Sequence, residues 1–298
     1  MNTLNNTPRL NCQICGAQLK ELYAYTWSGY AVFECTKCNF AARKDIPDQE
    51  KIQKLYGAGY MEHLKTGKNK TGRLIRQCEE KNTKHKKQFL ELINMEKRLR
   101  RLYNKKIFDV GFGMGEFLQI FSDFGFRADG CEISQECMAN QAQGGFGKLW
   151  LSFFENIELK PCSYGVIVMS SVIEHFADPK RVLEKAFEAL EPGGYIILMG
   201  ANFNSWNRKM NGSDWVGFTH GHFYFFSPYA ILKLLRQIGF SNIVFNHPEN
   251  YGFFSHKKLA AYLIKKFILF LRRGPLIQRT NKFFLIAQKP LTATRLAL

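Results

Sequence analysis

The stretch Lys106-Ile-Phe-Asp-Val-Gly-Phe-Gly-Met-Gly-Glu-Phe117 decides the fold of this chain of 298 residues. Its apolar beginning predicts a buried strand over 107–110, and its end predicts a helix from residue 116 to about residue 124. Between them lie three glycines, Gly111, Gly113 and Gly115. Because glycine lacks a Cβ, this turn can be tight and its backbone can lie against a ligand.

Two carboxylates indicate which ligand the turn receives. Glu132, within Gly130-Cys-Glu-Ile-Ser134, ends the next predicted strand, where it can accept hydrogen bonds from two ribose hydroxyls. Asp109 ends the first strand, where it would repel a pyrophosphate, and the spacing Gly-x-Gly-x-Gly differs from that of dinucleotide sites. A nucleoside cofactor that carries positive charge fits these residues, and S-adenosylmethionine is such a cofactor.

The region that follows continues the alternation of strands and helices. The pattern predicts a short buried strand over 164–169, then Ser-Ser-Val-Ile-Glu-His-Phe-Ala-Asp-Pro over 170–179, and a helix over 180–190. Glu191-Pro-Gly-Gly194 predicts a turn into a strand over 195–199. The elements expected near the end of the chain are a helix over 227–238 and strands over 241–246 and 281–289.

With these segments in this order, the chain resembles the class I S-adenosylmethionine-dependent methyltransferases from about Tyr56 to Lys289. The nearest branch looks like the small-molecule O-methyltransferases related to ubiquinone-biosynthesis and polysaccharide-cluster enzymes. The resemblance implies a doubly wound α/β fold with a seven-stranded, mostly parallel, Rossmann-like sheet. It also implies S-adenosylmethionine as the cofactor, held by the residues above together with Ser170, and it leaves the acceptor open.

The N-terminal region carries two Cys-x-x-Cys pairs, Cys12 with Cys15 and Cys35 with Cys38. Four thiolates in this spacing complete the tetrahedral shell of a structural Zn²⁺ ion. Two disulfides are the alternative, but the paired spacing favours zinc. Since the stretch between the pairs is aromatic and alternating, we expect a small zinc-ribbon module. A similar ribbon precedes the methyltransferase domain in some sugar C-methyltransferases, and by this resemblance it would help shape the acceptor cleft.

The sequence predicts three consecutive parts and one insertion. They are a zinc ribbon over 1–50, a helical extension over 51–105, the S-adenosylmethionine-binding domain over 106–290 and an amphipathic helical insertion over 253–278. Within the extension, Tyr60 is a candidate for covering the cofactor, as similar tyrosines do in the family, and a tyrosine packed in the loop is an equal alternative.

The net charge of +17 is distributed unevenly. Residues 107–200 contain more acidic than basic side chains, whereas the segments on both sides of them are basic. An acidic core suits a cationic cofactor, and basic flanks suit an anionic acceptor or surface. The sequence shows no N-terminal apolar run and no apolar stretch of bilayer length, so we expect a cytoplasmic protein.

Glu174-His175, just after the strand predicted over 164–169, is the first candidate for acid–base chemistry. His175 could act as a general base because histidine titrates near neutral pH. By resemblance to ubiquinone-type O-methyltransferases, Glu174 and His175 could instead hold a divalent ion against the acceptor. A histidine that only braces the loop is an equal alternative.

The second candidate is Asp214-Trp-Val-Gly-Phe-Thr-His-Gly-His222, where the acceptor loop of the family falls. We rank His220 slightly above His175 as the base, since two histidines near Asp214 favour acid–base work, while His222 is also expected in a packing role. Three aromatic residues are expected to form a wall for a sugar or ring: Trp206, Trp215 and Phe218.

Residues 256–273 separate into a basic side and an apolar side when they are placed on a helix. This pattern suits a helix that lies in a membrane surface, and it equally suits a helix packed on its own domain. The sequence thus leaves open a peripheral contact with the inner face of a membrane.

The leading hypothesis is a methyltransferase that acts on a hydroxyl of a small molecule or glycan, and a nucleotide- or lipid-linked sugar is one such acceptor. RNA methylation is the alternative suggested by the charge and the ribbon. Enzymes that methylate RNA bases commonly carry a Pro-Pro pair after the strand that corresponds to 164–169, and this chain has none there. A cofactor-binding protein without turnover is the third hypothesis, and the intact glycine turn argues against lost cofactor binding.

Overall fold

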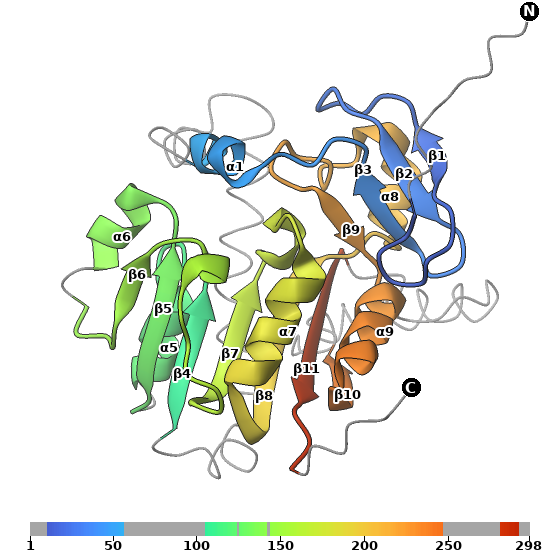
Figure 1. Cartoon of the computed structure of the whole chain (residues 1–298). Helices are drawn as coiled ribbons and strands as arrows, with labels where there is room; N and C mark the ends of the chain where they lie inside the picture. Colours follow the sequence, from blue (N-terminus) through green and yellow to red (C-terminus); the bar gives the residue numbers. More distant parts are fainter. Residues whose placement is uncertain (1–10, 57–104, 124, 142–143, 247–280, 292–298) are drawn as a thin grey trace, which may run out of the picture.

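The structure of the protein is a computed structural model that describes residues 11–56, 105–123, 125–141, 144–246 and 281–291. A sheet of seven strands with helices on its faces forms the larger part of the molecule, and a sheet of four strands stands beside it (Figure 1). The predicted helical extension largely falls on residues 57–104, and the predicted insertion falls on 253–278. Both lie outside the described residues, as does Tyr60.

The large sheet has the strand order β10-β11-β8-β7-β4-β5-β6. Its strands are β4 (Lys106–Val110), β5 (Arg127–Glu132), β6 (Leu149–Leu151), β7 (Tyr164–Ser170), β8 (Leu190–Ala201), β10 (Ser241–Asn246) and β11 (Lys282–Gln288). The five strands from β8 to β6 run parallel, whereas β11 is antiparallel to β8 and to β10. The expected seven-stranded, mostly parallel sheet is therefore confirmed.

Side chains from the central strands alternate between two cores, as the two-residue period of a strand requires. Phe108 and Ile167 belong to the core that contains α7 (Pro179–Ala189) and α9 (Pro228–Ile238). Ile107 and Val168 belong to the opposite core, which contains α5 (Glu116–Asp123). Because both faces of the sheet are covered, these strands read as nearly continuous apolar runs in the sequence.

Local signals set the ends of the two long helices. Asp178 caps α7, where its side chain accepts a hydrogen bond from the backbone of Arg181, and proline follows at the first turn. Ser227 caps α9 in the same way, and that helix ends at Gly239, whose φ of 113° lies in the left-handed region. The helix expected over 227–238 is thus confirmed almost to the residue.

The expected turn at Glu191-Pro-Gly-Gly194 is part of a strand in the structure. Helix α7 ends at Ala189, and β8 begins directly at Leu190. The reason is pairing with the residue that follows β11. The N–H of Gly193 donates to the carbonyl of Lys289 at 2.9 Å, and the N–H of Lys289 donates to the carbonyl of Gly194 at 2.8 Å. These non-local bonds extend a strand that the local sequence predicted to begin at residue 195.

The small sheet has the order β1-β2-β3-β9. Its first three strands are β1 (Lys20–Tyr23), β2 (Val32–Cys35) and β3 (Phe40–Arg43), and β1 and β2 form an antiparallel hairpin. The fourth strand, β9 (Tyr224–Phe226), comes from the far end of the chain and pairs with β3. The cysteine-containing region is therefore built together with the segment that precedes α9, and we call these four strands the N-terminal module.

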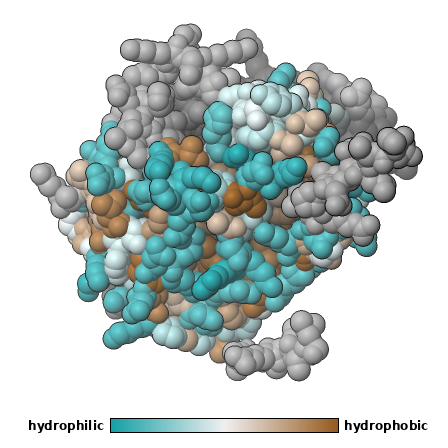
Figure 2. Space-filling model, turned by 45° about the horizontal axis from the view of Figure 1, so that its top comes forward, coloured by the Kyte–Doolittle hydropathy of each residue, from teal (hydrophilic) through white to brown (hydrophobic). Residues whose placement is uncertain are grey.

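On the face shown in Figure 2, hydrophilic residues cover much of the described surface, and hydrophobic residues reach it in separate small areas. This distribution agrees with apolar cores that lie between sheet and helices. Among the helices of the described ranges, none combines the length and the apolar character that a membrane crossing needs.

Candidate functional site

The glycine turn joins β4 to α5 and has the geometry that only glycine adopts readily. Gly113 has a φ of 54° and would meet nothing within 4 Å if it carried a Cβ, so its missing side chain leaves open space. Gly115 has a φ of 75°, and a Cβ there would collide with the side-chain amide of Gln141. One glycine therefore keeps a space free and the other permits close packing.

A cleft of about 300 Å³ opens at the carboxyl ends of the central strands. In an open α/β sheet this edge is where ligands bind. The predicted cofactor residues that line the cleft are Asp109, Gly111, Gly113, Glu132 and Ser170, and His175 lines it as well. Gly115 does not line the cleft, and its Cα faces the side chain of Gln141 instead.

The Glu132 carboxylate is held in place by backbone amides. Its Oε2 accepts from the N–H of Gly113 at 2.9 Å, and its Oε1 accepts from Ile133 at 2.7 Å and Ser134 at 3.0 Å. A carboxylate offers about four lone-pair positions, so capacity remains for a ligand hydroxyl. Glu132 is thus oriented before a ligand arrives.

Two further polar groups in the cleft fit a charged, hydrogen-bonding ligand. Asp109 is only 1% exposed, and a buried carboxylate is stabilised when a positive charge lies nearby. The buried hydroxyl of Ser170 has no hydrogen-bond partner among the described residues. Buried polar groups normally have partners, so a ligand group is the expected partner of this hydroxyl.

His175 stands on the wall of this cleft with its ring fixed. Its Nδ1 lies 2.7 Å from the carbonyl oxygen of Gly221 and also contacts the hydroxyl of Tyr56, which follows α1 (Gln49–Leu55). Since a carbonyl only accepts, we assign the single proton of the neutral ring to Nδ1, so that Nε2 is the unprotonated nitrogen of that tautomer. An unprotonated Nε2 can take a proton or bind a metal ion.

Glu174 and His222 lie beside His175. The His222 ring packs on the His175 ring at a centroid distance of 4.7 Å, and its Nε2 lies 4.0 Å from Oε1 of Glu174. Nδ1 of His222 is 2.8 Å from the carbonyl of Gly217, so this ring also carries its proton on Nδ1. Burial, and then the neighbouring His175, hold the pKa of His222 well below its ordinary value of 6.5.

His220 is exposed and lies outside the residues that line the cleft. It borders a separate shallow groove with Arg43, Lys51 and Lys54. The expected aromatic wall is wrong for two of its three members, since Trp215 and Phe218 are 2% and 0% exposed and belong to a core beneath the N-terminal module. Only Trp206 is open to solvent.

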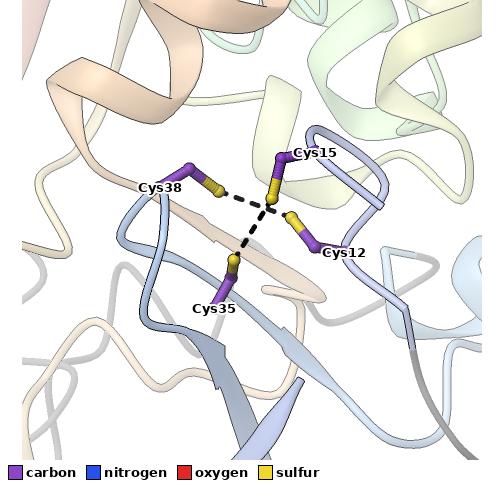
Figure 3. Close-up of side chains that lie close together, drawn as sticks. All are labelled: Cys12, Cys15, Cys35 and Cys38. Atoms are coloured by element: carbon purple, nitrogen blue, oxygen red, sulfur yellow. Dashed lines mark hydrogen bonds between the residues drawn. The ribbon is translucent and has the colours of Figure 1, made fainter. Parts of the chain in front are cut away.

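The four cysteines of the two Cys-x-x-Cys pairs come together at one end of the N-terminal module (Figure 3). The sulfur atoms of Cys12 and Cys38 are 3.4 Å apart, as are those of Cys15 and Cys35. The hydrogen bond with Cys38 lowers the pKa of Cys12 to about 5, which favours its thiolate, and the same bond raises the pKa of Cys38. Four sulfurs this close are the donor set of a structural zinc site.

Sequence reasoning did not identify two residues: Tyr56, which contacts His175, and Arg43, which contacts the neighbouring segment 220–223. Tyr56 lines the cleft at the end of α1, just before the segment in which Tyr60 was the candidate. Arg43 ends β3 and donates from its guanidinium to the carbonyl of His220 at 2.8 Å. A tyrosine next to a Gly-Ala-Gly stretch was a weak signal for the first, and the sequence held none for the second.

Comparison with known proteins identifies the family. Residues 77–244 match the family described as Methyltransferase domain. The chain belongs to this family. Its expected activity as an S-adenosylmethionine-dependent methyltransferase is confirmed, while the roles of the individual site residues stay predictions.

Curated relatives cover about half of this chain and about two thirds of their own length. The Ubiquinone biosynthesis O-methyltransferase of Idiomarina loihiensis is 24% identical over 163 residues, which are 49% of this chain and 67% of that protein. The protein of the same name from Vibrio atlanticus is 23% identical over 163 residues, 49% of this chain and 69% of its own. The uncharacterized protein MJ1123 of Methanocaldococcus jannaschii is 27% identical over 139 residues, 45% of this chain and 64% of its own.

The solved structures that resemble this chain include two described as SAM-dependent methyltransferases. A SAM-dependent methyltransferase from Archaeoglobus fulgidus has a TM-score of 0.48 and 21% identity, and the match covers 67% of this chain and 94% of that one. A SAM-dependent methyltransferase from Thermotoga maritima, described as a possible histamine N-methyltransferase, has a TM-score of 0.44 and 20% identity, with 62% and 82% covered.

Proposed function

We propose that this methyltransferase transfers a methyl group to a hydroxyl of a small-molecule acceptor, and that His175 is the general base. The observation that carries the proposal is the position of the His175 ring. It lies on the wall of the same cleft as Asp109, Gly113 and Glu132, with an unprotonated Nε2. Donor and acceptor groups would thus meet in one cavity.

On the donor side, the cleft offers two carboxylates, one for the ribose of the cofactor and one for its positive charge. Glu132 would accept a hydrogen bond from a ribose hydroxyl, and the buried Asp109 would face positive charge. Gly113 keeps the backbone open to the ligand. When bound there, S-adenosylmethionine supplies an electrophilic methyl group, so the protein contributes mainly alignment, which is worth roughly 7–11 kcal/mol in favourable cases.

On the acceptor side, the base would take the proton of the attacking hydroxyl. Nδ1 of His175 donates to the Gly221 carbonyl, so the ring can accept this proton at Nε2 and become an imidazolium. Such general base catalysis contributes about 10²–10⁴-fold. The carbonyl of Gly221 would then stabilise the charged ring through the hydrogen bond that it already accepts.

The acceptor class is proposed from the relatives, whose names describe O-methylation in ubiquinone biosynthesis. A glycan or a nucleotide- or lipid-linked sugar is the finer alternative, and RNA is the third. A transfer assay with tritium-labelled methyl groups distinguishes them when lipid extract, nucleotide-sugars and total RNA are offered in parallel. We expect label in a small-molecule fraction; label confined to RNA would contradict the proposal.

The same assay tests the base. His175→Gln keeps an amide that can donate to Gly221 but cannot accept the proton, so we expect kcat to fall by roughly 10²–10⁴-fold with the cofactor still bound. His220→Gln is the matched control, because His220 lies outside the cleft. If His220→Gln loses activity and His175→Gln does not, the base assignment is wrong.

A divalent cation is a second candidate for the same cluster. Glu174, His175 and His222 each offer one ligand atom, and these atoms lie within 4.8 Å of one another. The unprotonated Nε2 of His222 faces the Glu174 carboxylate, and two acceptors that face each other favour a cation between them. Binding of Mn²⁺ followed by electron paramagnetic resonance tests this role. A spectrum unchanged by Glu174→Gln would exclude it.

Peripheral contact with a membrane is a further proposal, and it rests on the sequence of residues 256–273 alone. A basic and an apolar side on one helix favour an anionic lipid surface. Flotation with anionic liposomes tests it, with Lys265→Glu and Phe267→Glu as variants that should each reduce binding. Flotation that neither substitution changes would contradict the proposal.

A further inference from the structure

Residues 220–223 lie between the N-terminal module and the wall of the cleft. On the cleft side, the Gly221 carbonyl accepts from Nδ1 of His175 at 2.7 Å, and the N–H of Phe223 donates to the carbonyl of Glu174 at 2.9 Å. On the other side, the segment faces the end of β3, where Arg43 stands, and the ring of Trp27, whose centroid lies 6.4 Å from that of His220. The segment thus supplies one of the contacts that orient the ring of His175, beside those of Tyr56 and His222.

Arg43 binds the segment at both ends. Its backbone N–H donates to the carbonyl of Phe223 at 2.9 Å, and its guanidinium donates to the carbonyl of His220 at 2.8 Å. The guanidinium also lies over the ring of Tyr30 at 4.1 Å, and the Tyr30 hydroxyl donates to the carbonyl of Thr219 at 2.9 Å. The peptide of Gly221 therefore sits between two carbonyls that one arginine holds.

The fit at Gly221 leaves little freedom. A Cβ on this residue would collide with the Tyr56 hydroxyl and would lie 3.3 Å from Nδ1 of His175. A displacement of the segment toward the cleft would therefore push against both rings, and a displacement away would break the hydrogen bond to His175. A small movement of the segment would therefore change the orientation of the His175 ring.

We propose that Arg43 is a positioning residue for methyl transfer: it holds residues 220–223 so that the Gly221 carbonyl fixes the ring of His175 toward the acceptor. This inference rests on the proposed function, in which His175 is the base. In this role Arg43 contacts neither the cofactor nor the acceptor. It affects the orientation of His175 through the peptide of Gly221, whose carbonyl accepts from the His175 ring.

The competing explanation is that Arg43 binds an anionic acceptor in the shallow groove that it lines with Lys51 and Lys54. The geometry favours positioning, because one guanidinium nitrogen is bonded to the His220 carbonyl and the group is stacked on Tyr30. Lys51 and Lys54, in contrast, extend into solvent. If the groove binds an anion, these lysines should matter at least as much as Arg43.

The first experiment compares Arg43→Ala and Arg43→Lys with Lys51→Ala as a charge-matched control. We expect Arg43→Ala to lower kcat by up to roughly 10²-fold, as small misplacements of catalytic groups do, with the affinity for S-adenosylmethionine unchanged. Arg43→Lys should recover part of the loss, since lysine keeps one donor but not the planar stack. An equal increase of KM in Arg43→Ala and Lys51→Ala, with kcat preserved, would overturn the inference.

The second experiment separates this inference from the proposed function through a double-mutant cycle. Arg43→Ala should have no further effect on kcat in a His175→Gln background, because it acts through His175. ¹⁵N chemical shifts of His175 should move from the Nδ1-protonated pattern toward a mixture of tautomers in Arg43→Ala alone. If His175→Gln keeps full activity, the proposed base is wrong; if it does not but the two losses multiply, the positioning role is wrong.

Discussion

The backbone N–H of Gly113 donates to Oε2 of Glu132 at 2.9 Å, and this bond joins the glycine turn after β4 to the end of β5. The two residues are 19 positions apart in the chain. They meet because parallel strands place their carboxyl ends at the same edge of the sheet. The residue predicted to hold the ribose therefore also sets the shape of the turn that faces the cofactor.

Glu132→Ala should weaken cofactor binding through both roles. Hydrogen bonds to a charged group contribute about 1.5–3 kcal/mol, so we expect the affinity for S-adenosylmethionine to fall on the order of 10- to 100-fold. Isothermal titration calorimetry measures the change. Glu132→Gln keeps one acceptor oxygen and should lose less. Unchanged affinity in Glu132→Ala would remove Glu132 from the cofactor site.

Gly113→Ala tests whether the open space at the turn belongs to the cofactor. Gly125→Ala is a matched control, because both glycines have a positive φ and neither would gain a contact within 4 Å, but Gly125 is not a lining residue of the cleft. Each substitution should cost about 1–2 kcal/mol of unfolding free energy from the left-handed backbone. Only Gly113→Ala should also lose cofactor affinity in calorimetry. Equal affinity in the two variants would contradict a ligand at Gly113.

The sequence was sufficient for the parts of the site that depend on local patterns. Apolar runs with a glycine turn predict strand and helix, and a carboxylate at the end of a strand has a known position in a parallel sheet. Asp109 and Glu132 were expected together for this reason, and Ser170 was expected from the family resemblance; all three line one cleft. The Cys-x-x-Cys pairs were equally informative, because their spacing carries the geometry of a metal shell.

Pairings between distant segments could not be predicted in the same way. Strand β9 joins β3 across about 180 residues, and nothing in three consecutive aromatic residues indicates that partner. Once β9 lies in the N-terminal module, Trp215 and Phe218 are buried beneath it and cannot form a wall for an acceptor. The same arrangement turns His220 toward the groove of Arg43 and places His222 against His175.

Loss of zinc from the four cysteines should lower methyl transfer more than it lowers cofactor binding. The protein should contain one Zn²⁺ per chain by atomic emission, and Cys38→Ser should lower this value, because three thiolates and a hydroxyl make a weaker shell. Ser227 donates to the carbonyl of Cys38 at 3.2 Å, so disorder at this cysteine reaches the start of α9 and the neighbouring β9. We expect kcat to fall while cofactor affinity changes little. Full activity in a zinc-free variant would show that the cysteines have another role.

Gly221→Ala tests the close packing behind His175. The added methyl group would collide with the Tyr56 hydroxyl and press on the His175 ring. Overpacking usually lowers the free energy of unfolding by about 1–3 kcal/mol. We expect the fall in kcat, expressed as an increase of the activation free energy, to exceed this loss of stability. Gly221→Ala combined with Tyr56→Phe should recover part of the activity, since the hydroxyl that collides is then absent. Activity and melting temperature are measured for both variants. If the double variant recovers no activity, the collision with the Tyr56 hydroxyl is not the cause of the loss.

Acidification should destabilise the fold through His222. Its pKa in the folded protein lies well below the ordinary 6.5, because burial and the nearby His175 disfavour the charged ring. As the pH falls below 6.5, the unfolded chain therefore binds a proton that the folded protein does not, and the free energy of unfolding decreases. The slope approaches about 1.4 kcal/mol per pH unit until the folded-state pKa is reached.

Urea unfolding measured above and below that ordinary pKa, in wild type and in His222→Asn, isolates this contribution. The amide of asparagine can still donate to the Gly217 carbonyl, whereas it does not titrate, so the variant should lose less stability on acidification. His220→Asn is the control, because His220 is exposed and its replacement should keep the wild-type slope. A slope that His222→Asn leaves unchanged would mean that His222 takes up its proton in the folded protein as readily as in the unfolded chain.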